Sequence, residues 1–496
     1  MPSILSANTL SSGYDVDNSA RLSGDSYLSK TPSNANYLHA TFSFWVKRSK
    51  LGTDQGLFGR KASNQTAHGT FCHFTATSDQ LLINFRNSGG TSRYYIITHR
   101  VFRDISAWYH IHIVIDGDNG TQADRIQLYI NGVRETAFDL LNTPSANDYE
   151  ISTFNNDGGT DFTVGRSLRS QNNTFYNFEG YMAEFHCSVA AAYPPTEFGE
   201  FDEDSPSIWK PKKADITYGN DGFYLEFKET GTSQNSSGIG ADTSGEDHHY
   251  AVTNLAATDQ STDTCTNNAC TWNTLYRNSA TFTQGNLVYQ APGSNPVFGS
   301  ITTFGVSAGK WYAECKYVAG SSHYGIIGIC DEVFATLGDL GSATNTDFGK
   351  TGAALGSHPN TCTVAYVINT GKIRNNNNNQ NYGSGGGDGD IINIALDRDN
   401  RKVYFGINGT YENSGDPAAG SNGFDLSSQV TGNEYFLGVT NDTGASETIL
   451  DFNFGGGFGQ TAVSSANADA NGHGNFEYAV PSGFFAWNTK NLAEQG

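Results

Sequence analysis

The sequence predicts an all-β protein built from two antiparallel β-sandwich domains. Three observations carry this prediction: a composition rich in turn-forming and aromatic residues, strands whose apolar residues alternate, and an Asn-Gly turn in each half. The 496 residues include 57 glycines, and aromatic residues make up 12%. Helical proteins favour Ala, Leu, Glu and Lys, whereas this mixture is typical of short strands joined by tight turns.

The strands of the first half are visible as alternating patterns. Residues 108–115 place His110 and His112 on one face and isoleucines on the other, which predicts a half-buried strand. The next apolar run, residues 126–130, ends at Asn131-Gly132. An Asn-Gly between two strand patterns is the strongest short-range signal of a hairpin.

The last part of the chain repeats this order of patterns. Residues 309–317 alternate, residues 324–329 have the composition of a buried strand, and residues 402–407 lead into Asn408-Gly409. The shared order predicts two related sandwiches rather than an array of short repeats.

Between the two patterned parts, residues 229–280 are rich in Ser, Thr, Gly, Asn and Asp. This composition predicts a linker or a segment that wraps a neighbouring subunit, and Leu255 indicates that it is not wholly disordered. The predicted domains are therefore residues 1–228 and residues 281–496.

Charge and cysteine content exclude several classes of function. The net charge of −21 argues against nucleic acid as a partner, because phosphate binding needs clustered Lys and Arg. No run reaches the roughly 18 apolar residues of a membrane span, and the first residues lack a secretory signal. The odd count of seven cysteines favours free thiols in a cytoplasm, although Cys265 and Cys270 are close enough in sequence for a disulfide.

Five short motifs of the first half occur in the order of a known family. They lie at residues 42–47, 108–110, 128–132, 164–166 and 178–180. Together they resemble a laminin-G-like, concanavalin A-type domain over roughly residues 15–228. That family usually carries an Asp-Glu pair on its late strand, where this chain has Ala183-Glu184, so the resemblance implies no calcium site here.

The second half resembles SPRY domains over about residues 280–490. The motifs that carry the resemblance lie at residues 309–312, 328–329, 389–397 and 403–409. Both resemblances imply the same architecture, two concanavalin A-like, jelly-roll β-sandwiches.

The order of the two domains resembles structural proteins of marine bacteriophages, and residues 224–227, 254–260 and 481–489 fit as well. This resemblance implies a virion surface protein, made in the host cytoplasm, in a tail fibre or similar appendage. Its expected partners are other virion proteins and a host-surface glycan, and it is expected to form a homo-oligomer, with a trimer favoured. The alternatives are a capsid decoration protein without a host ligand and, less favoured, a glycan depolymerase.

An acidic run offers the sharpest enzymatic hypothesis. Glu200, Asp202 and Asp204 alternate, as do the catalytic carboxylates of some concanavalin A-type glucanases. The run follows two prolines and precedes Pro206, which favours an exposed connection over a strand that lines a groove. We therefore predict no catalytic residue and no enzyme activity.

No metal ligand set or cofactor motif is evident. Residues 116–124 are acidic, but their spacing departs from an EF-hand, so we predict a plain turn and leave an irregular calcium site open. His248 and His249 are neighbours, which makes joint binding of one ion difficult. We predict neither a metal nor a cofactor.

Candidate ligand residues come from exposed aromatic and amide side chains, which together bind sugars in many proteins. Tyr94 and Tyr95 are adjacent in a strand pattern, so one of them, taken here as Tyr95, should face outward. Tyr382 follows a polyasparagine run and is expected to be exposed beside Asn379 and Asn381. A surface loop without a ligand is the alternative for each.

Overall fold

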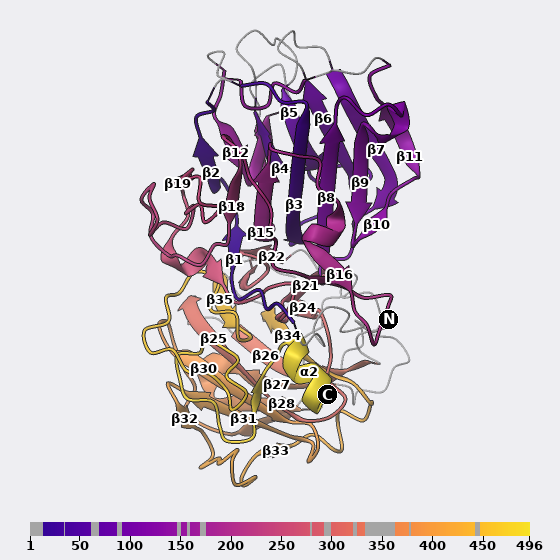
Figure 1. Ribbon diagram of the computed structural model, residues 1–496. Coiled ribbons are helices and arrows are strands. Elements are labelled where there is room, and N and C mark those ends of the chain that lie inside the picture. Colours follow the sequence, from indigo (N-terminus) through magenta and orange to yellow (C-terminus); the bar gives the residue numbers. More distant parts are fainter. Residues whose placement is uncertain are drawn as a thin grey trace. The chain divides into compact units, whose positions relative to one another are not determined.

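The computed structural model describes residues 13–496 except 34, 61–68, 87–91, 146–149, 156–158, 169–174, 278–279, 292–298, 321–324, 333–362, 376–377 and 442–446. The chain divides into two compact units, one within residues 10–267 and the other within residues 268–496. Each unit is a sandwich of antiparallel sheets (Figure 1), which confirms the predicted fold class. None of the described helices is long and apolar enough to cross a membrane.

Sheet A of the first unit has the strand order β10-β9-β8-β3-β15-β1-β20, with β18 paired to β15. Its strands are β1 (Ser19–Leu22), β3 (His39–Arg48), β8 (Trp108–Asp116), β9 (Ile126–Ile130), β10 (Val133–Arg134), β15 (Gly180–Ser188), β18 (Phe223–Leu225) and β20 (Gln260–Ser261).

Sheet B of the first unit has the strand order β11-β7-β6-β5-β4-β12-β2-β19. Its strands are β2 (Tyr27–Lys30), β4 (Gln55–Arg60), β5 (Thr70–Phe74), β6 (Gln80–Arg86), β7 (Ser92–Val101), β11 (Phe138–Asn142), β12 (Phe162–Val164) and β19 (Ala251–Thr253).

Two small hairpins and three short turns complete the described part of the first unit. The hairpins pair β13 (Arg166–Leu168) with β14 (Phe175–Asn177) and β16 (Gly199–Phe201) with β17 (Trp209–Pro211). The 3-10 turns are η1 (Gln122–Asp124), η2 (Pro195–Glu197) and η3 (Ala257–Asp259).

The hydrophobic core of the first unit lies between sheets A and B. Phe42 and Phe44 of β3 point into it, and Phe42 stacks on Phe58 of sheet B with ring centroids 4.8 Å apart. Ile111 and Ile113 of β8 lie in the same core, as their alternation predicts.

The opposite face of β8 differs from the half-buried strand that the sequence predicts. His110 is 1% exposed and His112 is fully buried, because other parts of the chain cover this face of sheet A. Trp209 of the β16–β17 hairpin donates its indole N–H to Nδ1 of His110 over 2.9 Å, and His112 contacts the carbonyl of Tyr193 at 3.0 Å. Alternation could place the histidines on one face but could not show that a distant hairpin would cover them.

Residues 229–280, expected to be a linker or wrapping segment, are divided between the two units. Up to residue 267 they belong to the first unit, where β19 pairs with β2 and β20 pairs with β1. Tyr250 and Leu255 are buried in that unit's core. Backbone pairing and these two apolar side chains therefore anchor a segment whose polar composition is typical of a linker.

The two ends of the first unit lie side by side. Val16 donates its N–H to the Thr266 hydroxyl, which in turn donates to the Val16 carbonyl, each over 3.0 Å. Ser19 is the register partner of Ser261. The chain therefore enters and leaves this unit at one place.

Sheet C of the second unit has the order β21-β24-β34-β26-β27-β28-β29. Its strands are β21 (Trp272–Arg277), β24 (Gly299–Thr302), β26 (Gly325–Asp331), β27 (Thr363–Val367), β28 (Lys372–Asn375), β29 (Asn378–Asn381) and β34 (Tyr435–Asn441). The 3-10 turn η5 (Ile368–Thr370) joins β27 to β28.

Sheet D has the order β22-β23-β35-β25-β30-β31-β32, with β33 paired to β31 and β36 paired to β25. Its strands are β22 (Thr281–Thr283), β23 (Val288–Ala291), β25 (Lys310–Ala319), β30 (Ile391–Asp397), β31 (Lys402–Ile407), β32 (Thr410–Tyr411), β33 (Phe424–Asp425), β35 (Thr448–Asn453) and β36 (Phe485–Ala486). Helix α2 (Thr489–Gln495) follows, and Trp311 and Trp487 are fully buried in the core.

Both predicted Asn-Gly hairpins are confirmed, and they are built alike. Asn131 and Gly132 have φ of 49° and 74°, and Asn408 and Gly409 have φ of 51° and 81°. Two consecutive positive φ angles are the mark of the type I′ turn that suits a twisted hairpin. Each asparagine side chain also accepts a backbone N–H of the strand paired with the one before it, from His110 of β8 at 2.8 Å and from Ile391 of β30 at 2.9 Å.

Six cysteines lie in the described part of the chain, all six are buried, and no disulfide joins Cys265 to Cys270. Cys362 lies outside the described residues. Burial raises the pKa of the Cys72 and Cys265 thiols well above the usual range, which disfavours their reactive thiolate form.

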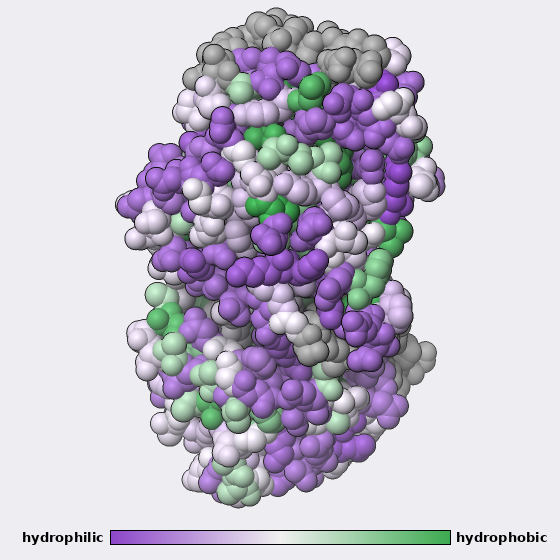
Figure 2. Space-filling model, viewed as in Figure 1, coloured by the Kyte–Doolittle hydropathy of each residue, from purple (hydrophilic) through white to green (hydrophobic). Residues whose placement is uncertain are grey.

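Hydrophilic side chains cover most of the face of the molecule seen in Figure 2, and apolar residues are scattered over it. The exposed large apolar residues of the described chain are Val101, Val133, Leu140, Leu141, Phe201 and Leu275. Single exposed apolar side chains are normal on a soluble protein.

Candidate functional site

Glu184 lies at a break in the regular pairing of β15. The register of β15 against β3 shifts between Ala183 and His186, and Glu184 has φ of 50°. Residues other than glycine uncommonly adopt this left-handed backbone conformation. Bulges of this kind often re-aim a side chain near a functional site. The bulge makes Glu184 the centre of the candidate site.

Two tyrosines hold the Glu184 carboxylate, which is nearly buried at 6% residue exposure. Tyr14 donates its hydroxyl to Oε2 over 3.0 Å, and Tyr224 of β18 donates to Oε1 over 2.7 Å. The two hydroxyl oxygens are 3.1 Å apart. Burial, followed by the charge of Glu184, raises the pKa of both tyrosines above their usual range, so both hydroxyls remain protonated donors.

His186 stacks on the ring of Tyr224 and helps to hold the two tyrosines and Glu184 in place. The ring of His186 lies 3.9 Å from that of Tyr224, with 12° between the ring planes, and its Nδ1 is 2.8 Å from the Tyr218 hydroxyl. Its Nε2 is 3.7 Å from Oε2 of Glu184, which is too long for a hydrogen bond. These contacts fix the orientation of the Tyr224 ring.

We call these five residues the Glu184 cluster: Tyr14, Glu184, His186, Tyr218 and Tyr224. Some of its side chains are buried and others are partly exposed. His186 and Tyr218 are buried, whereas Tyr14 and Tyr224 are half-buried. A fixed carboxylate next to two partly accessible aromatic rings suits recognition of a hydroxyl-rich ligand.

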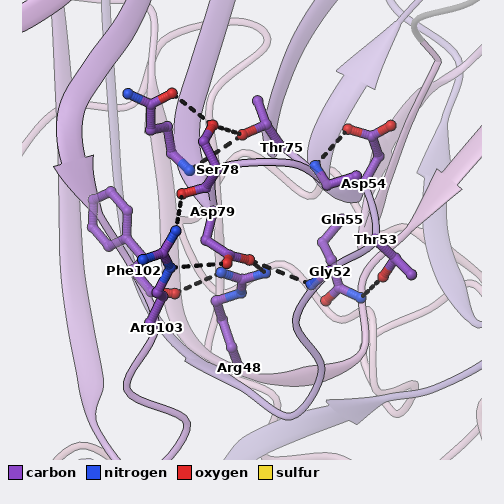
Figure 3. A network of polar contacts seen from close by, with 12 residues as sticks. Arg48, Gly52, Thr53, Asp54, Gln55, Thr75, Ser78, Asp79, Phe102 and Arg103 are labelled. Atoms are coloured by element: carbon purple, nitrogen blue, oxygen red, sulfur yellow. Dashed lines mark hydrogen bonds and ion pairs between the residues drawn. The ribbon is translucent and has the colours of Figure 1, made fainter.

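A second polar network, around Asp79, joins loops of the same unit (Figure 3). Asp79 has φ of 56°. Its carboxylate accepts hydrogen bonds from Nη2 of Arg48 at 3.1 Å and from Nε of Arg103 at 3.2 Å. Arg48 is fully buried and also donates to the carbonyl of Phe102. The contacts drawn in Figure 3 join residues of the chain to one another, so we interpret the network as a loop anchor.

The structure corrects the expected exposure of Tyr382. Its side chain is only 7% exposed and packs at right angles to the rings of Tyr366 and Phe405. Its hydroxyl accepts the N–H of Phe405 at 3.4 Å. The residues just before Tyr382 form the edge strand β29 rather than a loop. Tyr382 follows the last residue of this strand, and its side chain lies in the core.

The other three candidate ligand residues are accessible but do not form one site. Asn379 and Asn381 are exposed on β29, where Oδ1 of Asn379 is 3.4 Å from Nε of Arg374. Tyr95 is half-buried on β7 of the first unit, next to the fully buried Tyr94, so the expectation that one of the pair faces outward is confirmed. Their role in binding stays a prediction.

The acidic run lies at the end of β16 and in the connection from β16 to β17. Glu200 is exposed and lies 3.4 Å from Nζ of Lys210, and Asp202 lies 3.5 Å from the same atom. Asp202 also accepts the backbone N–H groups of Asp204 and Ser205, so it caps a turn. The two carboxylates thus share one cation, and the absence of catalysis here stays a prediction.

The acidic turn after β8 meets a histidine from the neighbouring strand. Nε2 of His39 is 2.8 Å from Asp118 and 3.3 Å from Asp116, and potential ligand atoms of the three residues lie within 4.8 Å of one another. Asp124 instead pairs with Arg134. His39 and Asp118 are within hydrogen-bonding distance, and the three residues form a group that could hold a metal ion, so the irregular calcium site stays open.

The histidine pair of the former linker is held by backbone groups. His248 places Nδ1 2.8 Å from the Gly222 carbonyl, and His249 accepts the Asp242 N–H at 3.0 Å. Sequence reasoning mentioned Glu184 only in a pair that departs from the family's calcium motif, and it proposed none of Glu184, Tyr14, Tyr218 and Tyr224 as ligand residues. These residues are far apart in the chain, so no local pattern could have joined them.

Fold and site define the first unit as a concanavalin A-like β-sandwich with a carboxylate–tyrosine cluster. Residues 22–188 match a family model described as the concanavalin A-like lectin/glucanases superfamily. No curated protein sequence matches the chain.

Three of the solved structures that match the chain have between 14% and 16% sequence identity. The SPRY domain of human HERC1 has 15% identity, covers 38% of this chain and 99% of its own, and gives a TM-score of 0.28. A "putative carbohydrate binding protein" from Bacteroides ovatus ATCC 8483 has 14% identity, with 49% and 60% covered and a TM-score of 0.32. A heptameric SAP-like pentraxin from Limulus polyphemus has 16% identity, with 36% and 80% covered and a TM-score of 0.27.

Proposed function

We propose that the first unit binds a carbohydrate at the Glu184 cluster. One observation carries the proposal: a nearly buried carboxylate is held by two tyrosine hydroxyls, and the rings of those tyrosines are half-buried. Sugar sites combine an aromatic face with polar groups that bond the sugar hydroxyls. The match of residues 22–188 to the concanavalin A-like lectin/glucanase family supports the same class of ligand.

In this proposal the sugar is bound and released without cleavage. A sugar ring packs on the accessible edge of Tyr14 and Tyr224, and its hydroxyls donate to Glu184. Glycoside hydrolysis uses two carboxyl groups that flank the scissile bond, whereas the Glu184 cluster contains one, held by two phenols. A protein that acts by binding alone is the simpler reading of this arrangement.

The wider setting that we propose is a bacteriophage particle. The protein would lie on the virion surface as an appendage component and would attach the particle to a host glycan, in several copies. Single shallow sugar sites bind weakly, and linked sites can strengthen attachment by roughly 10²–10⁴-fold without new contacts. This part of the proposal rests on the sequence resemblance alone.

A glycan array with purified full-length protein tests the binding site. Tyr224→Phe keeps the ring but removes the hydroxyl that holds Glu184, and we expect roughly tenfold weaker binding, the cost of about one strong hydrogen bond. Tyr129→Phe is the matched control, because Tyr129 is half-buried on the same sheet but bonds Gln127 instead. Equal binding by wild type and Tyr224→Phe would contradict the proposed site.

A second comparison separates the two units. The double variant Asn379→Ala, Asn381→Ala removes the exposed amides of β29 and should leave glycan binding unchanged. Loss of binding in this variant, with Tyr224→Phe unaffected, would move the site to the second unit. Release of reducing ends from a bound glycan would show that the protein is a hydrolase.

The virion setting needs its own measurement. Gold-labelled antibody against the protein should decorate an appendage of intact particles, and mass measurement of the detached appendage should give a multiple of the chain, with three copies expected. Absence of label on particles would refute the setting and leave the glycan proposal in place.

A further inference from the structure

Lys47 and Asp263 form a fully enclosed pair in the first unit. The Lys47 side chain is 1% exposed and that of Asp263 is 2% exposed, with 2.8 Å between Nζ and Oδ2. Lys47 lies on β3, and Asp263 lies two residues beyond β20, so 216 positions of chain separate them. The pair joins the last residues of the unit to the middle of sheet A.

Apolar residues make up much of the surroundings of the pair, and the buried guanidinium of Arg21 lies near Tyr181. Apolar residues cluster at this place on the outer face of sheet A, and Nζ of Lys47 lies 5.5 Å from the centre of the Tyr181 ring. The cluster consists of Val16, Trp45, Trp108, Tyr181, Ala183, Trp209 and Cys265, with Tyr14 packed against it. A buried ion pair in such surroundings loses much of the hydration of both charges, and a neutral product of the pair would not carry that cost.

Both reacting groups are held in place. On β3, Lys47 is paired to Trp108 of β8 on one side and to Tyr181 of β15 on the other. Asp263 donates its N–H to the Ser261 hydroxyl at 3.1 Å and accepts the Ser19 hydroxyl on its carbonyl at 2.6 Å. Fixed groups at contact distance react far faster than free ones, because no encounter is needed.

A third group is placed to assist a reaction at the carboxyl carbon. The indole N–H of Trp108 donates to Oδ1 of Asp263 over 3.1 Å, while Lys47 contacts the other oxygen. A donor fixed on one carboxyl oxygen stabilises the negative charge that develops there when a nucleophile attacks the carbon. The two oxygens therefore have different roles: Oδ1 is held, and Oδ2 faces the amine.

We propose that Lys47 and Asp263 join through an intramolecular amide bond. One proton of the Lys47 ammonium first passes to Oδ2, which frees the lone pair of Nζ. That lone pair forms the new bond to Cγ of Asp263, and the bond from Cγ to Oδ2 breaks with its electron pair on oxygen. A second proton passes from Nζ to Oδ2, which leaves as water. Nothing is oxidised or reduced, and no co-reactant is consumed. Trp108 acts on the reacting carboxyl group and is the catalytic residue of this step.

The intact mass of the denatured full-length protein tests the bond. We expect wild type to be lighter than its sequence mass by the mass of one water molecule, and a protease digest to contain a branched peptide that joins Lys47 to Asp263. A full sequence mass without the branched peptide would overturn the proposal.

Variants locate the loss of mass. Lys47→Arg keeps the positive charge but should restore the full sequence mass, whereas Lys210→Met, at a lysine that pairs with Glu200 and Asp202, should still lack one water. Loss of water that persists in Lys47→Arg comes from another place in the chain and refutes the bond. The branched peptide of wild type keeps the test decisive if Lys47→Arg does not fold.

Asp263→Asn gives an independent signature. The same attack on an asparagine releases ammonia instead of water, so the bonded variant should be lighter than its own sequence mass by one ammonia molecule, which the Lys47→Arg change should abolish. Loss of water from the double variant would contradict the assignment of the leaving group to residue 263.

Discussion

The indole N–H of Trp209 donates to Nδ1 of His110, which makes that nitrogen an acceptor and leaves Nε2 to contact the hydroxyl of Ser43 at 2.8 Å. Both ring nitrogens are thus used by the neutral form of the histidine. A protonated ring would place a second donor against the indole N–H. Burial, and after it the charge of His112, lowers the pKa of His110 well below its usual value.

The first prediction is that acid weakens the first unit through this buried histidine layer. Burial lowers the pKa of His112 to about 3, so the folded state favours the neutral ring. The contribution of the neutral histidine to the unfolding free energy is therefore fully present above the unfolded pKa of about 6.5. It is lost as the pH falls towards 3, by up to about 1.4 kcal/mol per pH unit for one histidine.

Urea titrations between pH 7 and pH 4 measure this effect. His112→Gln should flatten the decline of unfolding free energy, whereas His99→Gln, at a residue whose side chain is 74% exposed, should leave it unchanged. Parallel declines in wild type and His112→Gln would show that other groups dominate.

The second prediction concerns the contact between Gly132 and the hairpin that covers the histidines. Gly132 has φ of 74°, and a Cβ built there would lie 2.1 Å from the Trp209 ring. Gly132→Ala should cost more than 2 kcal/mol, about 1–2 kcal/mol from the left-handed backbone plus about 1–3 kcal/mol from overpacking.

Gly24→Ala is the matched control, because Gly24 has φ of 57° but no atom within 4 Å of its Cβ position. It should cost only the backbone part, about 1–2 kcal/mol. The denaturation midpoints of the two variants measure the difference. Equal midpoints would mean that the β16–β17 hairpin moves to accommodate the added methyl group at no cost.

The third prediction concerns Glu314 in the second unit, which is fully buried on β25. Burial raises its pKa to about 7, although the N–H groups of Glu477 and Tyr478 and the Tyr312 hydroxyl donate to it and oppose the rise. Because the folded pKa exceeds the unfolded one, this group's contribution to stability is present below about pH 4.5 and is lost as the pH rises through 7.

The expected loss from Glu314 across this window is roughly 3 kcal/mol, as an order of magnitude. Glu314→Gln should remove that pH dependence, and it should destabilise the unit at low pH, because an amide nitrogen cannot accept the Glu477 N–H. Thermal unfolding between pH 4.5 and pH 8 provides the measurement. A variant that keeps the wild-type pH profile would show that Glu314 does not titrate in this range.

The fourth prediction concerns the loop anchor at Asp79. Asp79→Asn tolerates the positive φ but removes the charge that faces the buried guanidinium of Arg48, and loss of one partner of a buried ion pair costs about 3–5 kcal/mol. Asp139→Asn removes an exposed partner of His99 and should change stability by less than about 1 kcal/mol. Similar effects of both changes on the unfolding free energy would refute the anchoring role.

Sequence patterns predicted what depends on near neighbours in the chain. The alternation of Ile111 and Ile113 predicted the inner face of β8, and Asn131 and Asn408 predicted two hairpins, because turn chemistry and strand period are local properties. The patterns failed where distant segments meet. Tyr382 follows a polar run that is typical of a loop, yet β29 pairs with β28 and carries the tyrosine to the core.

The candidate site was less predictable than the fold for the same reason. Glu184 was not predicted as a site residue, because the bulge that re-aims its side chain arises from the register between β15 and β3. Tyr14 and Tyr224 are separated by 210 positions, and only the closed sandwich brings their hydroxyls to one carboxylate. A site assembled across sheet A leaves no short motif in the sequence.

The pairing of Val16 with Thr266 places the two ends of the first unit next to each other. A domain whose two ends meet can be removed from a chain, or inserted into a loop of another, with little strain on its host. Residues 13–267 could therefore be transplanted between carriers without redesign of the junction. In an evolving population the same geometry would let recombination exchange this unit for another of different specificity while the rest of the chain stays unchanged.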